Sequence, residues 1–165
     1  ALDDPPLGYT IYWLGARVNN GGPLPALELT HVSRYNPGDG SWPADQVVLE
    51  YGDPSQPFVD QPVVRIFEYS REVWARIPAT THGPDGPCWS TEEVRLADGR
   101  ATLFAGFSWP DDVPPDPHDP DACPTDREHD RFFAHAFLGD TVVVIDIPFD
   151  SRASLDAALM ALKPR

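Results

Sequence analysis

One histidine and one aspartate are spaced so that a strand pair would bring their side chains near each other. His135 lies in RFFAHAFL and Asp146 in TVVVIDI, on either side of Gly139-Asp140. If these stretches form a hairpin about that turn, His135 faces Val144 and lies diagonal to Asp146, and diagonal neighbours are about 7–8 Å apart. A carboxylate can orient an imidazole for acid–base chemistry, so the pair is a candidate catalytic site. The alternative is a half-buried histidine that a carboxylate holds for structure.

Carboxylates are also concentrated in an acidic, proline-rich loop that we expect at residues 109–130. Oxygen ligands at this density could hold Ca²⁺, and the candidate ligands are Asp116, Asp119 and Asp121. The spacing departs from that of an EF-hand, because a loop counted from Asp119 has Pro124 where the motif requires glycine. The alternative is a solvated loop that binds no ion. We expect no other cofactor.

Two tryptophans, Trp42 and Trp109, each lie directly before a proline in a predicted loop. Exposed loop aromatics can anchor a protein partner or stack on sugars. The alternative is that each ring folds back over the rim of the core. These two residues are therefore candidate binding residues.

The two cysteines, Cys88 and Cys123, both lie in polar segments rich in turn residues. A free cysteine more often lies in apolar surroundings, so we predict a disulfide, with two free thiols as the alternative. Such a bridge would stabilise the fold by about 3–4 kcal/mol in the chain-entropy model and would imply an oxidising compartment.

The chain has 165 residues, which is the size of one domain, and a formal net charge of −14. A surface this acidic repels phosphate backbones and anionic lipids, so we expect neither nucleic acid nor a membrane surface as a partner. No apolar run approaches the roughly 18 residues of a membrane-spanning helix, so we expect no direct membrane insertion.

Twenty prolines leave little room for long helices, and the segments between them are mainly of strand type. Aromatic and β-branched residues predict strands at four places: Tyr9–Leu14, Leu27–Val32, Gln46–Tyr51 and Val63–Tyr69. The first of these is bulky on both sides, which predicts a central or covered strand.

A hairpin is predicted over Glu92–Phe107, with Asp98-Gly99 as its two-residue turn. This turn sets Leu96 opposite Ala101. Five apolar residues then share one face, namely Val94, Leu96, Ala101, Leu103 and Ala105. The charged residues then share the other face, so one side of the hairpin packs on the core and the other faces water.

A second hairpin is predicted over Arg131–Ile147, with Gly139-Asp140 as its turn. It places Phe132 opposite Ile147. One of its faces is small or aliphatic throughout, and its alanines leave room for a helix to pack closely.

A suitable helix follows, capped by Asp150 or Ser151 and ended by Pro164. Its apolar residues have amphipathic helical spacing, namely Leu155, Ala158, Leu159 and Leu162. We therefore predict an α+β fold that is mostly β: a twisted antiparallel sheet of six to eight strands with the C-terminal helix packed on one face.

Three short segments resemble a pattern in uncharacterised secreted or lipid-anchored proteins of actinobacteria and related bacteria. They are Tyr12-Trp13-Leu14-Gly15, Leu29-Thr30-His31-Val32 and Leu49-Glu50-Tyr51-Gly52. Here Asp53-Pro54 follows the Tyr-Gly pair, where those proteins often place a cysteine. The resemblance implies an extracytoplasmic location and no particular reaction, so it assigns a role to no residue.

The first residues, from Ala1 to Pro6, look like the start of a mature chain after removal of a leader, although a boundary unrelated to processing would look the same. We therefore expect residues 1–165 to form a single extracytoplasmic domain, secreted or tethered to the surface. Our first hypothesis is a non-catalytic binding or scaffolding domain, within a larger assembly or alone, whose partner is a protein or cell-surface component. The alternatives are a hydrolase or metal-dependent enzyme, and a carbohydrate-binding module.

Overall fold

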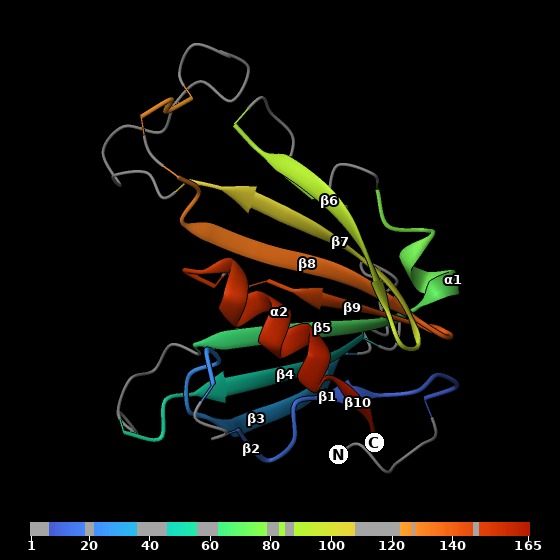
Figure 1. Ribbon diagram of the computed structural model, residues 1–165. Helices are drawn as coiled ribbons and strands as arrows, with labels where there is room; N and C mark the ends of the chain where they lie inside the picture. Colours follow the sequence, from blue (N-terminus) through green and yellow to red (C-terminus); the bar gives the residue numbers. More distant parts are fainter. Residues whose placement is uncertain are drawn as a thin grey trace.

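The computed structural model describes residues 7–18, 22–35, 46–55, 63–78, 83–84, 88–107, 123–126, 128–146 and 149–165. Within them, an eight-stranded antiparallel sheet has the order β2-β3-β4-β5-β9-β8-β7-β6 (Figure 1). Its strands are β2 (Arg17–Val18), β3 (Leu27–Tyr35), β4 (Gln46–Gly52), β5 (Val64–Ser70), β6 (Ser90–Leu96), β7 (Gly99–Gly106), β8 (Arg131–Leu138) and β9 (Thr141–Ile145). The predicted fold class is confirmed.

The strand predicted at Tyr9–Leu14 is mostly wrong. Only β1 (Tyr12–Trp13) is a strand, and it pairs with β10 (Lys163–Pro164) in a separate two-stranded ribbon. The rest of this segment crosses one face of the sheet, where Tyr9, Ile11 and Leu14 are buried. The bulky pattern on both sides therefore reflects a cover packed against the sheet, and not a sheet strand.

The first hairpin has the predicted apolar face but a different register. The prediction that its other face meets water is wrong at Phe104, which is 5% exposed and stacks on Phe133. Val94 lies opposite Ala101 and Leu96 opposite Gly99, so the turn is Ala97-Asp98 instead of Asp98-Gly99. A Cβ atom on Gly99 would lie 1.9 Å from the backbone oxygen of Phe137 in β8. Glycine is therefore required at this position for close approach of two backbones, and not for the turn.

The second hairpin is confirmed at its turn. Leu138 pairs with Thr141 across Gly139-Asp140, and Gly139 has a φ of 54°. At the open end, Phe132 forms its bridge with Phe149 and not with Ile147 as predicted. Ile147 itself lies outside the described residues.

Helix α2 (Arg152–Ala161) packs across the sheet, as predicted (Figure 1). The Ser151 side chain caps it by accepting a hydrogen bond from the Ser154 N–H. The helix ends at Ala161, before the predicted stop at Pro164. Pro164 instead belongs to β10. No described helix is long and apolar enough to cross a bilayer.

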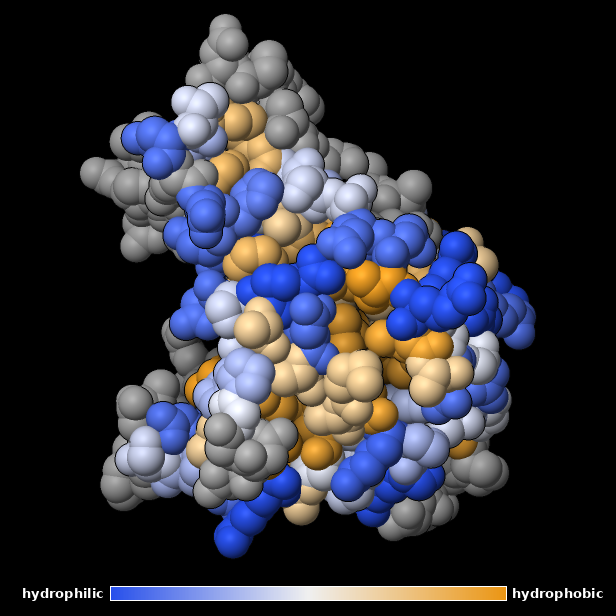
Figure 2. Space-filling model, viewed as in Figure 1, coloured by the Kyte–Doolittle hydropathy of each residue, from blue (hydrophilic) through white to orange (hydrophobic). Residues whose placement is uncertain are grey.

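The main core lies between α2, the N-terminal segment and one face of the sheet. Leu155 and Ala158 of α2 are completely buried, and they belong to the same apolar cluster as Ala134 and Ala136 of β8. On the side of the sheet that α2 covers, apolar surface gathers around the helix and is surrounded by hydrophilic residues (Figure 2). The small alanines let the helix approach β8 closely, as the sequence predicts.

The predicted disulfide is present. Cys88 and Cys123 are bonded, with their Cα atoms 5.1 Å apart. The bond ties the segment before β6 to the segment before β8.

One carboxyl group is buried inside the main core. Glu68 of β5 is 0% exposed, and its Oε1 accepts a hydrogen bond from the Tyr12 N–H at 2.9 Å. Its Oε2 has no hydrogen-bond partner among the described residues. Burial therefore raises the pKa of Glu68 well above its usual value, and the hydrogen bond from Tyr12 offsets only part of this effect.

Replacing Glu68 with glutamine should alter the pH dependence of stability. Because the pKa of Glu68 is raised by folding, the native protein binds more protons than the unfolded chain between the two pKa values. The free energy of unfolding should therefore fall as pH rises above about 4.5, by up to about 1.4 kcal/mol per pH unit from this group. Glu68→Gln should remove this component in urea unfolding from about pH 5 to 8, whereas Glu93→Gln, on exposed β6, should retain it. If the free energy of unfolding of Glu68→Gln depended on pH as that of the parent does, the raised pKa of Glu68 would be contradicted.

The packing of α2 can be tested with two truncations on the same helix. Leu155 is 0% exposed and Met160 is 80% exposed. Leu155→Ala should lower the free energy of unfolding by about 2–5 kcal/mol, because it leaves a cavity under the helix. Met160→Ala should change it by less than about 0.5 kcal/mol in the same denaturant titration. Equal losses would show that α2 does not pack as described.

Candidate functional site

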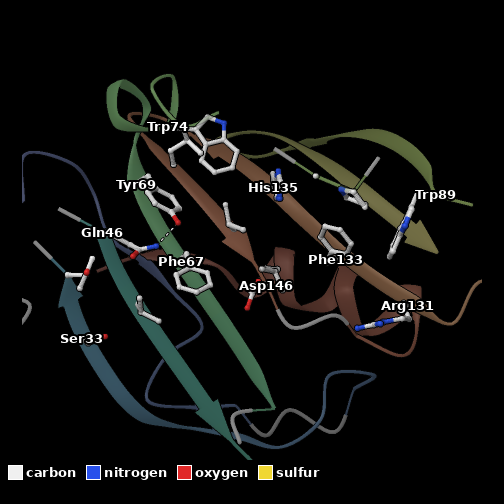
Figure 3. Close-up of a pocket in the computed structure, with 17 residues that line it drawn as sticks. Ser33, Gln46, Phe67, Tyr69, Trp74, Trp89, Arg131, Phe133, His135 and Asp146 are labelled. Atoms are coloured by element: carbon white, nitrogen blue, oxygen red, sulfur yellow. Dashed lines mark hydrogen bonds between the residues drawn. The ribbon is translucent and has the colours of Figure 1, made fainter. Parts of the chain in front are cut away.

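A cavity of about 750 Å³ lies on the sheet face opposite α2 (Figure 3). Side chains from five neighbouring strands line it, together with the helix that follows β5 and the segment that precedes β6. The lining includes Ser33, Gln46, Val48, Phe67, Tyr69, Trp74, Trp89, Arg131, Phe133, His135, Val144 and Asp146.

The floor of the cavity is a row of residues directly opposite one another across five strands. Strand pairing sets Ser33 of β3 against Val48 and Val48 against Phe67. It then sets Phe67 against Val144 and Val144 against His135. Directly opposite residues share a sheet face, so this row is a continuous strip with an apolar centre.

One end of the cavity is closed by Trp74, which α1 (Arg71–Trp74) positions. The Ser70 side chain caps this short helix by accepting a hydrogen bond from the Val73 N–H at 3.1 Å. Trp74 is then 8% exposed, and its ring lies 5.5 Å from that of Tyr69. Burial raises the pKa of the Tyr69 hydroxyl, which accepts a hydrogen bond from the side-chain amide of Gln46. The end wall is therefore aromatic, and its one hydroxyl, that of Tyr69, is bound by Gln46.

His135 lies among aromatic rings at the side of the cavity. Its ring is 5.2 Å from Trp74 in an edge-on arrangement and 4.9 Å from Phe104. The histidine is 4% exposed. Its imidazole therefore forms part of an aromatic wall, which sequence reasoning did not predict.

The opposite end of the cavity is bounded by Trp89 and Phe133. Their rings meet edge to face, with centroids 5.4 Å apart, and Phe133 stacks on Phe104 at 4.8 Å. The Trp89 ring lies against Gly106 of β7, where a Cβ atom would come within 2.5 Å of the ring carbons. Glycine is needed there because only a bare backbone lets the indole lie so close.

Charged groups lie along one margin of the cavity. The Arg65 guanidinium contacts the Glu50 carboxylate at 3.1 Å and that of Asp146 at 3.3 Å. Arg131, at the start of β8, also lines the cavity and lies at the end away from Trp74 (Figure 3). The margin thus combines a cluster of one guanidinium and two carboxylates with a further cation.

The structure brings His135 and Asp146 to the same cavity without showing them as a catalytic pair. The Asp146 carboxylate bonds to Arg65, and it points away from the imidazole (Figure 3). His135 faces Val144, as the predicted register requires. Acid–base chemistry by this pair stays a prediction.

The other candidate site residues lie outside the described residues. These are the loop tryptophans Trp42 and Trp109 and the candidate calcium ligands Asp116, Asp119 and Asp121. Within the described part of the chain, no group of three or more histidine, cysteine or acidic residues is arranged to hold a metal ion.

Sequence reasoning missed most of the cavity, although one signal for it was present. In the β5 segment, Val64 and Ile66 belong to one set of alternate positions, and Phe67 and Tyr69 belong to the other set. Apolar residues at both sets of positions indicate a strand covered on both faces. Trp74 and Trp89 gave no such signal, because they lie in connections between strands.

The Trp89 wall can be tested with a double-mutant cycle. Gly106→Ala should destabilise the protein, because the new methyl group displaces the indole. In a Trp89→Ala background, the same change should cost less, giving a coupling energy of about 0.5–3 kcal/mol in denaturant unfolding. Additive effects of the two substitutions would show that the ring does not lie on Gly106.

Comparison of the chain with models of protein families, with curated proteins and with solved structures found no match. The resemblance of the Tyr12–Gly15 segment to bacterial surface proteins is therefore not tested by a relative and stays a prediction. The cavity, its lining and the disulfide are the observations from which a function can be argued.

Proposed function

We propose that this chain is a non-catalytic extracytoplasmic binding domain, and that its ligand is a small, largely apolar molecule held in the cavity. The cavity carries this proposal. Its volume of about 750 Å³ lies within the range of roughly 300–1,000 Å³ that is typical of small-molecule sites.

The chemistry of the lining also supports binding of an apolar body. The floor offers Val48, Phe67 and Val144, and the walls offer the rings of Trp74 and Phe133. Burying apolar ligand surface against such groups is favourable by roughly 25 cal/mol per Å². Polar side chains also line the cavity around this apolar floor, and such groups can fix the orientation of a bound molecule.

The arrangement favours binding over hydrolysis. A serine nucleophile must lie within about 3 Å of its base. Ser33 and His135 lie at opposite ends of the floor, on β3 and β8, and four strand spacings separate them by roughly 19 Å. The other candidate partner, Asp146, is engaged with Arg65. The hydrolase alternative therefore lacks a matched nucleophile and base among these residues.

The carbohydrate alternative finds less support among the described tryptophans. A sugar platform requires an exposed aromatic face. Trp74 is 8% exposed and Trp89 is only partly exposed, and both rings close the ends of the cavity. They enclose a ligand and do not present a flat surface.

The extracytoplasmic part of the proposal is supported by the disulfide. Disulfides form and persist in oxidising compartments and are rare in the cytosol. The Cys88–Cys123 bond agrees with this location. A cell-surface component or a protein partner would then be the source or the recipient of the bound molecule.

Filling the cavity should abolish ligand binding. Val144→Trp places an indole at the centre of the floor, so titration with the neutral apolar dye N-phenyl-1-naphthylamine should show stoichiometric binding by the parent and at least about tenfold weaker binding by the variant. Arg95→Trp adds the same side chain on β6, outside the cavity lining, and should bind like the parent. No saturable binding to the parent, or undiminished binding to Val144→Trp, would refute the proposal.

A further inference from the structure

We propose that the ligand is a monocarboxylic acid with an apolar body, and that Arg131 binds its carboxylate. This inference rests on the proposed function and deepens it by naming the chemical class of the ligand. It depends on three features: the position of Arg131, the absence of a side-chain partner for it among the described residues, and the state of the other charges in the cavity.

Arg131 is placed where it can meet the polar end of a bound molecule. It opens β8, opposite Gly106, and its side chain is partly buried in the cavity lining. It lies at the end of the cavity away from Trp74 (Figure 3). A ligand on the apolar floor would therefore direct one end to the guanidinium and the other to the Trp74 wall.

The Arg131 guanidinium makes no ion pair and no side-chain hydrogen bond with another described residue. Five other described arginines have carboxylate partners, namely Arg17, Arg65, Arg76, Arg100 and Arg152. Arg71 instead binds the Gly139 carbonyl, and Arg165 lies over the Trp13 ring. Arg95 resembles Arg131 in lacking one, but Arg95 is exposed and outside the cavity.

A partly desolvated cation without a counter-ion is unfavourable, and an anionic ligand group would relieve this cost. Guanidinium binds carboxylate through two parallel hydrogen bonds, which fix orientation as well as charge. The carboxylate is therefore the anion that one open arginine fits best.

The remaining charges limit the ligand to a single negative charge. Arg65 is already engaged by Glu50 and Asp146, so it does not offer a second cationic contact. A phosphate or dicarboxylate would bring excess negative charge toward Asp146 and into a protein with a net charge of −14. An amine would meet Arg131 as a like charge, and the carboxylate that could receive it, Asp146, is bound to Arg65.

Three probes with the same tail separate the head-group preference from binding of the tail. They are decanoate, 1-decanol and decyltrimethylammonium, each titrated by calorimetry below its aggregation threshold. We expect decanoate to bind the parent most tightly. Arg131→Gln should weaken decanoate binding by about 10- to 100-fold, the loss expected for a charge-assisted pair, while decanol binding changes by less than about twofold.

Arg95→Gln is the matched control, because it removes an arginine that lies outside the cavity and has no carboxylate partner among the described residues, and it should bind all three probes like the parent. A thermal melt of Arg131→Gln should match that of the parent, since the Arg131 guanidinium has no partner in the described part of the chain to lose. If decanol binds as tightly as decanoate, or if Arg131→Gln retains decanoate affinity, the carboxylate assignment is wrong and the apolar-ligand function stands. Preference for decyltrimethylammonium would also overturn the assignment. If none of the three probes binds, the proposed function fails with it.

Discussion

The alternation of side chains along the central strands determines both the core and the cavity. In β5, Val64, Ile66 and Glu68 project to the face covered by α2, while Phe67 and Tyr69 project to the other. Because both sets are mostly apolar, both faces of the sheet require cover. The N-terminal segment and α2 cover the centre of one face. On the other face, the four-residue helix α1 covers one end, and the floor beyond it forms a cavity.

Burial of Glu68 shows that the covered face contains more than apolar contacts. Its carboxyl oxygen holds the Tyr12 backbone, and the Tyr51 hydroxyl accepts a hydrogen bond from the Leu14 N–H at 3.0 Å. These two contacts satisfy amide groups of a segment that lies flat on the sheet and has few strand partners of its own. Buried polar groups on β4 and β5 thus fix the path of the cover, at the cost of one desolvated carboxyl group.

Local patterns predicted faces better than they predicted pairings. The alternation in Glu92–Phe107 correctly assigned the apolar face, but a register shift of two residues leaves every side chain on the same face, so the pattern could not exclude it. The actual register depends on the approach of Gly99 to Phe137 in the neighbouring strand. The turn at Gly139-Asp140 and the helix stripe around Leu155 were predictable, because each depends on residues close in sequence. The cavity was not, since its floor requires β9 to lie beside β5, and nothing local to either strand specifies that neighbour.

The ribbon formed by β1 and β10 has a consequence for how the domain would respond to force. Tyr12 pairs with Pro164, and the Arg165 N–H donates to the Ile11 carbonyl at 2.9 Å, so both ends of the chain leave from the same end of this ribbon. Tension applied between the ends would load these hydrogen bonds one after another and peel the two strands apart. Mechanical extension would therefore begin by separating the N-terminal cover and the stretch after α2, while the opposite sheet face, with its cavity, would initially bear little load.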